Sequence, residues 1–139
     1  MEFIKKALLA LAIIALTGCS LGDDEEKYHY EVLPIESIVF PDEFVLGEVY
    51  TIDFTYLQPT SCHGYYNIYI NAENENRTLA VTSIVFNDNN CEQLTQNNEV
   101  LQSFDFKVLY DQTYRFHIWK GVDDLGEDIY EVIEVPTIN

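Results

Sequence analysis

The sequence predicts an all-β protein, an antiparallel β-sandwich of about seven strands that follows a short N-terminal leader. Segments rich in Tyr, Phe, Val, Ile and Thr recur along residues 28–139, and clusters of Pro, Gly, Asn and Asp separate them. The clearest segment, residues 49–57, alternates apolar and polar side chains. Nothing in residues 28–139 keeps the 3.6-residue period of an amphipathic helix. At 139 residues and 47% hydrophobic composition, the chain can form one domain with a packed core.

The first element of the chain is a leader. Lys5 and Lys6 precede an apolar run of ten residues at 7–16, well short of the roughly 20 that a membrane-spanning helix needs. Residues 1–18 therefore have the pattern of a secretory signal peptide. The run Leu-Thr-Gly-Cys at 16–19 resembles the lipobox of bacterial lipoproteins, in which the Cys is acylated and becomes the new N-terminus. The resemblance implies that Cys19 carries lipid, and at least two acyl chains hold a protein stably on a membrane.

Residues 19–27 are expected to be a solvated acidic tether. The run Asp-Asp-Glu-Glu at 23–26 resembles the export signal of surface lipoproteins of Bacteroidota. That resemblance implies an outer-membrane protein displayed on the cell surface. A plain spacer on a periplasm-facing lipoprotein is the alternative.

The predicted β-domain starts at residue 28. Its first strand region, 31–40, is broken by Pro34, which suits an edge strand. A short segment at 44–46 leads into the strand at 49–57, whose alternation indicates one face on a core. The core face of this strand should carry Tyr50, Ile52, Phe54 and Tyr56.

Five further strands are predicted at 65–71, 78–86, 100–109, 113–120 and 129–135. In the strand at 65–71, alternation places Tyr66, Ile68 and Ile70 toward the core and Tyr65 and Tyr69 outward. In the strand at 100–109, Phe104, Phe106 and Val108 should point inward. The C-terminal residues 136–139 are expected to fray.

Residues 109–114, Leu-Tyr-Asp-Gln-Thr-Tyr, resemble the segment before the penultimate strand of immunoglobulin-like sandwiches, where a Tyr forms a "tyrosine corner". Tyr114 would be that residue; the alternative is a Tyr simply packed at a strand start. The resemblance implies an immunoglobulin-like arrangement in which the strand at 113–120 pairs with the strand at 65–71. A small closed β-barrel is the alternative fold.

Once Cys19 is assigned to lipid, Cys62 and Cys91 remain as an even pair in an oxidising compartment. A disulfide between them is the default expectation, and two free thiols are the alternative. The bridge would join the loop at 58–64 to the long polar loop at 87–99.

Candidate chemistry is sparse. His29, His63 and His117 lack the spacing of a zinc site. His63 follows Cys62, which suggests a Cys–His nucleophile pair, but the disulfide would remove the thiol. Two acidic loops, at 87–90 and 123–128, offer the oxygen ligands that calcium takes, without the spacing of a calcium-binding loop; solvated turns are the simpler interpretation. We therefore expect no enzyme activity, no cofactor and no metal.

The charge restricts the partners. The chain has 24 acidic and seven basic side chains, and removal of the leader with Glu2, Lys5 and Lys6 leaves 23 and five, a net charge of −18. Nucleic acid is excluded because its phosphates would be repelled. We expect a monomer that meets the membrane through its N-terminal lipid.

One surface is a candidate ligand-binding face. If Tyr114, Phe116 and Ile118 point into the core, the residues between them point out, and an immunoglobulin-like pairing brings two tyrosines beside them. The predicted face consists of Tyr65, Tyr69, Arg115, His117 and Trp119. Exposed aromatic rings among polar groups suit a glycan, a peptide or another envelope protein. The alternative is that Trp119 only covers the edge of the sandwich.

Two classes of function follow. The first is a non-enzymatic binding or adhesion module on the cell envelope. The second is an inhibitor of a secreted enzyme such as a basic lysozyme, for which the negative charge is complementary. Trp-Lys-Gly at 119–121 is the one faint candidate for an inhibitory loop.

Overall fold

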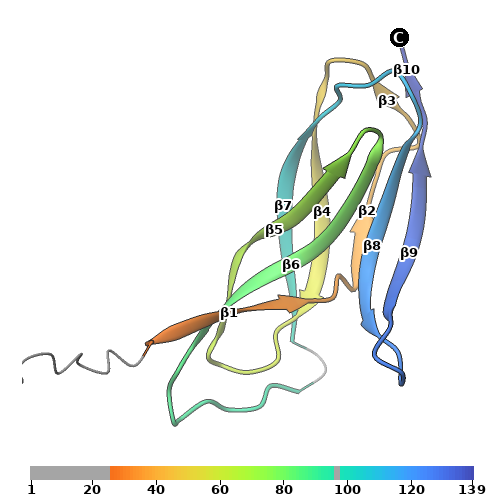
Figure 1. Ribbon diagram of the computed structural model, residues 1–139. Helices are drawn as coiled ribbons and strands as arrows, with labels where there is room; N and C mark the ends of the chain where they lie inside the picture. The colour runs from red at the N-terminus through yellow and green to blue at the C-terminus, as the bar shows by residue number, and fades with distance from the viewer. Residues whose placement is uncertain (1–25, 96–97) are drawn as a thin grey trace, which may run out of the picture.

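The computed structural model describes residues 26–95 and 98–139, and this part of the chain contains ten β-strands and no helix (Figure 1). In chain order the strands are β1 (Tyr28–Leu33), β2 (Ser37–Val39), β3 (Phe44–Val45), β4 (Val49–Leu57), β5 (His63–Glu73), β6 (Asn76–Phe86), β7 (Glu99–Lys107), β8 (Tyr114–Val122), β9 (Asp128–Val135) and β10 (Thr137–Ile138). The all-β prediction is confirmed, and β1 starts where the sequence places the start of the domain. The leader, Cys19 and most of the acidic tether lie outside the described residues.

Two sheets, in which antiparallel pairs predominate, pack against each other. The five-stranded sheet is built around β6, which pairs with β5 along one side and with β1 and β8 along the other, while β9 pairs with β8. The three-stranded sheet has the order β2-β4-β7. A short parallel pair, β3 with β10, lies at the end of the molecule that holds the C-terminus (Figure 1).

Strand β8 has a different neighbour from the one predicted. Its antiparallel partner is β9, and on its other side it pairs in parallel with β6 over Asn76–Leu79. The predicted pairing of β8 with β5 is therefore wrong, because the second strand of the β5–β6 hairpin lies between them. The predicted ligand-binding face is still possible, because β5, β6 and β8 belong to one sheet, with β6 between the other two.

Pro34 ends β1 and sends the chain from one sheet to the other. Pro has no N–H to donate to a ladder, so the strand region predicted at 31–40 is divided at this residue. The next two backbone N–H groups bind the two sheets in turn: Ile35 donates to Trp119 O at 3.2 Å, and Glu36 donates to Thr55 O at 2.8 Å.

The core lies between the two sheets and is rich in aromatic rings. As predicted, β4 alternates, and Ile52, Phe54 and Tyr56 are fully buried while Tyr50 packs against the cluster. Strand β7 contributes Phe106 to this core from the same sheet as β4. Strand β8 contributes Tyr114, Phe116 and Ile118 from the other sheet, and all four side chains are buried. The inward positions predicted for Phe104, Phe106 and Val108 are also confirmed.

Tyr114 forms the predicted tyrosine corner. Its ring is completely buried, and its hydroxyl oxygen accepts hydrogen bonds from the backbone N–H groups of Leu109 at 2.9 Å and Tyr110 at 3.0 Å. A second tyrosine repeats the arrangement at the start of β4, where the Tyr50 hydroxyl accepts from the Val45 N–H at 2.9 Å. The Tyr114 hydroxyl thus satisfies two backbone donors of the connection before β8. The Tyr50 hydroxyl satisfies the N–H of Val45 in β3, since the N–H groups on either side of it, not its own, are the ones that donate toward β10.

The C-terminal tail does not fray. Residues Thr137–Ile138 form β10 and pair with Phe44–Val45 of β3. Phe44 N–H donates to Pro136 O at 2.8 Å and Leu46 N–H donates to Ile138 O at 3.0 Å. The prediction was wrong because Phe44 is fully buried, and the backbone that holds this ring at the end of the core needs a partner strand.

The predicted disulfide between Cys62 and Cys91 is present, with Cα atoms 5.4 Å apart. It joins the loop before β5 to the long loop before β7, as expected. Two further contacts between these loops reinforce it: Ser61 N–H donates to Glu92 O at 2.9 Å, and the Ser61 hydroxyl accepts from Glu92 N–H at 3.0 Å.

Replacing Tyr114 by Phe should lower the free energy of unfolding by about 1–3 kcal/mol, because two backbone N–H groups lose a common acceptor in a partly buried position. Urea unfolding followed by tryptophan fluorescence measures the change. Tyr110→Phe removes a hydroxyl from an exposed ring nearby and serves as the matched control. An unfolding midpoint equal to that of the control would contradict the assigned role of the Tyr114 hydroxyl.

Candidate functional site

The outer face of the five-stranded sheet carries the candidate site. Since side chains alternate along a strand, the buried positions of β8 leave Arg115, His117 and Trp119 on the opposite side. The register then places neighbours from the other strands beside them. One row across the sheet consists of Asn71, Thr78, His117 and Val132, and Trp119 lies opposite Tyr130 in the next row.

An apolar groove of about 270 Å³ lies on this face. We call it the aromatic groove; it is lined mainly by Val32, Tyr69, Ala80, Trp119 and Tyr130. Thr78 and Asp128 complete its rim. These residues come from β1, β5, β6, β8 and β9, so every strand of the sheet contributes to the groove.

Asp128 holds two of the aromatic side chains in place. Its Oδ1 accepts a hydrogen bond from Trp119 Nε1 at 2.9 Å, and its Oδ2 accepts a long one from the Tyr130 hydroxyl at 3.4 Å. Removal from water, followed by the nearby Asp128 charge, raises the pKa of Tyr130 above its ordinary value. The Tyr130 hydroxyl therefore stays protonated and can donate at neutral pH.

A polar pocket, also of about 270 Å³, adjoins the aromatic groove and shares Thr78 and Tyr130 with it. Its remaining lining residues are Asn71, Glu73, Asn76 and His117. The His117 ring meets the Tyr130 ring edge-on, with centroids 6.3 Å apart. Flat apolar area and side chains that donate or accept hydrogen bonds thus lie next to each other on one surface.

Three of the five residues predicted for this face, Tyr69, His117 and Trp119, line the groove or the pocket. Arg115 also points outward, but its Nε donates to Glu134 Oε1 at 2.8 Å in an exposed cross-strand pair. Exposed pairs of this kind stabilise a protein little. Sequence reasoning missed Tyr130 because β9 had no assigned partner; its position opposite Trp119 follows only from the register.

Tyr65 does not belong to this face, and its prediction was wrong. A bulge between Tyr65 and Asn67 changes the phase of β5, so Tyr65 points into the core, 6.1 Å from Phe54 and 6.2 Å from Tyr56 between ring centroids. Tyr66, predicted inward, is consequently exposed. A bulge adds one residue without a partner, and simple alternation cannot anticipate it.

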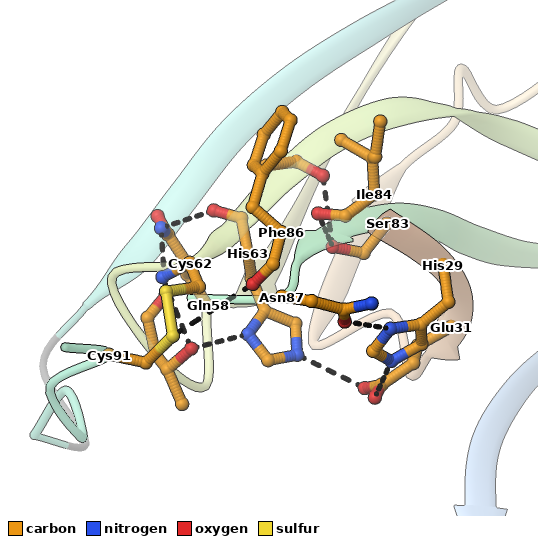
Figure 2. A network of polar contacts seen from close by, with 12 residues as sticks. His29, Glu31, Gln58, Cys62, His63, Ser83, Ile84, Phe86, Asn87 and Cys91 are labelled. Atoms are coloured by element: carbon orange, nitrogen blue, oxygen red, sulfur yellow. Dashed lines mark hydrogen bonds and ion pairs between the residues drawn. A yellow bond between two sulfur atoms is a disulfide. The ribbon is translucent and has the colours of Figure 1, made fainter. Parts of the chain in front are cut away.

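A second polar cluster joins the inner-facing side chains of β1 to the start of β5 and to the loops that carry the disulfide (Figure 2). The carboxylate of Glu31 joins two imidazoles: Oε1 is 2.9 Å from His29 Nε2, and Oε2 is 3.0 Å from His63 Nε2. The other ring nitrogens contact Asn87 Oδ1 at 3.0 Å and Thr60 Oγ1 at 2.7 Å. This His–Glu–His bridge links β1 to β5 and to the loops on both sides of the disulfide.

The bridge has a structural role in this arrangement. Thr60, His63 and Glu31 follow one another as hydroxyl, imidazole and carboxylate, but the His63 side chain is only 8% exposed. The Thr60 hydroxyl also accepts from the Cys62 N–H at 3.2 Å, as expected of a side chain that stabilises a turn. The Cys62 sulfur is bonded to Cys91, so it is not a nucleophile.

The two acidic loops use their carboxylates to stabilise turns. Asp88 Oδ1 accepts from Asn90 N–H at 2.9 Å, and Asp123 Oδ1 accepts from the N–H groups of Leu125 and Glu127 at 2.8 and 2.9 Å. Among residues 26–95 and 98–139, no group of three or more His, Cys, Asp or Glu side chains has the geometry to hold a metal ion.

No protein-family model, curated protein or solved structure matches this chain significantly. None of the segments that the structure describes contains a helix long and apolar enough to cross a membrane.

Glu31→Gln should reveal the pH range over which the bridge stabilises the fold. The hydrogen bond to Glu31 raises the pKa of His29, so its contribution is present below about pH 6.5 and is lost as the pH rises through the raised pKa. The hydrogen bonds from His29 and His63 lower the pKa of Glu31, so its contribution is present above about pH 4.5 and is lost as the pH falls through the lowered pKa.

The difference in melting temperature between the wild type and Glu31→Gln should therefore be largest near pH 5.5, and smaller at pH 3 and pH 8.5. Scanning calorimetry at the three pH values measures it. Glu134→Gln, which removes the partner of Arg115 on the opposite face, is the control. A difference that does not vary with pH would show that the bridge is not ionised in the folded protein.

Proposed function

We propose that this chain is a lipid-anchored protein of the cell envelope whose β-sandwich binds a neutral saccharide on the outer face of the five-stranded sheet. The anchor is Cys19, and the binding residues are those of the aromatic groove and the polar pocket. The protein acts as a binding or adhesion module without catalysis of its own. We place it in the outer membrane, on the cell surface.

The anchor is supported by the order of the N-terminal segments. A positive start, a short apolar run and Leu-Thr-Gly-Cys at 16–19 are followed by the acidic residues 23–26 and then, at Tyr28, by the first strand. Eight residues separate Cys19 from β1, so the nine steps from Cys19 to Tyr28 span at most about 32 Å when extended. A lipid on Cys19 would therefore hold the sandwich close to the membrane surface.

The observation that carries the saccharide assignment is the contact between the aromatic groove and the polar pocket along Thr78 and Tyr130. A sugar ring has an apolar face of C–H groups and a rim of hydroxyls that both donate and accept hydrogen bonds. The rings of Tyr69, Trp119 and Tyr130 offer flat apolar area to such a face. The amides of Asn71 and Asn76 and the imidazole of His117 offer the mixed donors and acceptors that hydroxyls need.

Charge favours a neutral saccharide. Asp128 lies at the rim of the groove and Glu73 in the pocket, and the mature chain carries a net charge of −18. Uronic acids, sialic acids and phosphorylated sugars would be repelled at close range.

The other candidate ligands have less support. A peptide that binds by strand addition needs a free sheet edge, whereas the groove lies over the middle of the sheet. The run 119–121 that sequence analysis considered as an inhibitory loop belongs to β8. The ammonium of Lys120 donates to the backbone carbonyls of Ile35 and Glu36, both at 2.8 Å. Its hydrogen bonds are thus made within the protein and not offered to a target enzyme.

Trp119→Ala should weaken saccharide binding by about tenfold or more, because a central aromatic ring contributes much of the energy of such a contact. Affinity electrophoresis in gels containing starch, β-glucan, mannan, xylan or glycol chitin measures the binding. The wild type should be retarded by at least one of these neutral polymers. The melting temperature should fall by only a few degrees, since the half-buried ring loses one hydrogen bond to Asp128.

Leu101→Ala is the matched control, because Leu101 is 66% exposed and lies on β7 of the other sheet. It should migrate like the wild type in every gel. If none of the five polymers retards the wild type, the saccharide assignment is wrong. A loss of folding in Trp119→Ala would assign the indole to the core instead.

Cys19→Ala should abolish incorporation of labelled palmitate in growing cells, because the acylated sulfur is missing. Cys62→Ser and Cys91→Ser should still incorporate the label, since their sulfurs form the disulfide. Label in Cys19→Ala would refute the proposed anchor. Protease treatment of intact cells then distinguishes the two orientations: digestion supports surface display, and survival until lysis supports a periplasm-facing protein.

A further inference from the structure

We infer that the saccharide is a polymer, and that its chain extends from the aromatic groove along β1. The extension is made by Tyr28, Tyr30 and Tyr66, which we call the tyrosine strip. This inference rests on the proposed function, because it names the class of saccharide that the same face takes. A mono- or disaccharide would use the groove alone.

The tyrosine strip continues the groove directly. Tyr28, Tyr30 and Val32 alternate with inward residues along β1, and Val32 is itself part of the groove wall. Two-residue steps on a strand measure about 7 Å, so Tyr28 lies about 13 Å beyond Val32 on the same face. The ring of Tyr30 meets that of Tyr28 at 5.7 Å and that of Tyr66 at 4.7 Å between centroids.

Folding does not account for the exposure of these rings. Tyr28, Tyr30 and Tyr66 are 45%, 49% and 53% exposed, and none of them belongs to the core cluster. Three adjacent aromatic rings that remain in water form a patch of the kind that marks a binding surface. With the groove, the patch gives two aromatic areas on one face of the sheet, joined by Val32.

The bulge in β5 gives the strip its third ring. Without the extra residue between Tyr65 and Asn67, alternation would bury Tyr66 and expose Tyr65. The bulge instead turns Tyr66 outward, across β6, to meet Tyr30. Bulges are frequent where a strand must re-aim a side chain next to a binding site.

The charged neighbours of the strip within β1 face away from it, while Glu26 and Lys27, which line a pocket with Tyr28 and Tyr30, carry opposite charges. His29 and Glu31 alternate with the tyrosines on β1 and point to the inner side, where the His–Glu–His bridge holds them (Figure 2). The strip therefore presents ring faces and phenol hydroxyls, which suit a neutral chain of sugar rings more than an acidic polymer or an anionic lipid surface. The groove and the strip together are too long for one or two sugar units.

The test uses the polymer that retards the wild type most strongly in the electrophoresis experiment, cut into oligosaccharides of two to eight units. Calorimetric titration should show an affinity that rises with length beyond the units that fill the groove. Tyr30→Ala and Tyr66→Ala should each weaken binding of the longest oligosaccharide by about three- to tenfold and leave that of the shortest unchanged. Tyr30→Phe should bind like the wild type, because it keeps the ring.

The outcomes separate the two proposals. Affinity independent of length, or tyrosine variants that bind the longest oligosaccharide like the wild type while Trp119→Ala does not, would overturn the inference and leave the proposed function standing. Absence of binding to all five polymers would remove both. If Tyr30→Ala changes only the sedimentation coefficient or only flotation with phosphatidylcholine vesicles, the strip contacts a second copy of the chain or a membrane instead, and the inference fails.

Discussion

Four aromatic rings, those of Phe44, Phe106, Tyr114 and Phe116, meet between the two sheets, and every pair among them lies within 5.1 to 6.1 Å between centroids. They come from β3, β7 and β8, so one cluster joins the five-stranded sheet, the three-stranded sheet and the short β3–β10 pair. Four of the six pairs are edge-to-face and one is stacked, and aromatic contacts of these kinds add about 0.5–1.5 kcal/mol each to the burial of the rings. The Tyr114 hydroxyl also holds the connection that precedes β8.

This packing determines what the outer surface can be. Because β8 sends alternate side chains to opposite faces, burying Tyr114 and Phe116 commits His117 and Trp119 to the outside. The register with β9 then brings Tyr130 opposite Trp119, and Asp128 holds the indole in place. A candidate binding surface thus arises on the rigid centre of a sheet rather than on a loop, which keeps its geometry well defined.

The aromatic core does not extend to the end of the molecule where β1 begins. There the inner positions of β1 and β5 carry His29, Glu31 and His63, and a carboxylate between two imidazoles replaces apolar contact. The disulfide closes the loops beside it. This end is also the one from which the chain leads toward Cys19, so the part of the sandwich nearest the proposed anchor is stabilised by polar and covalent links.

Much of the architecture could be predicted from local patterns: the all-β class, the alternation of β4 and β8, the break at Pro34, the tyrosine corner and the pairing of the two domain cysteines. These features depend on the period of apolar residues, on the missing N–H of proline, on a local sequence motif, or on the number of cysteines left for pairing. Strand order, the bulge after Tyr65 and the docking of β10 were not predictable, because each depends on partners distant in sequence. The sequence by itself thus determined which residues of β8 leave the core, but only the tertiary structure decided their neighbours. The register of the β8–β9 pair places Tyr130 opposite Trp119, the β6–β8 pair brings Tyr69 to the same groove, and the bulge in the β5–β6 pair turns Tyr65 inward.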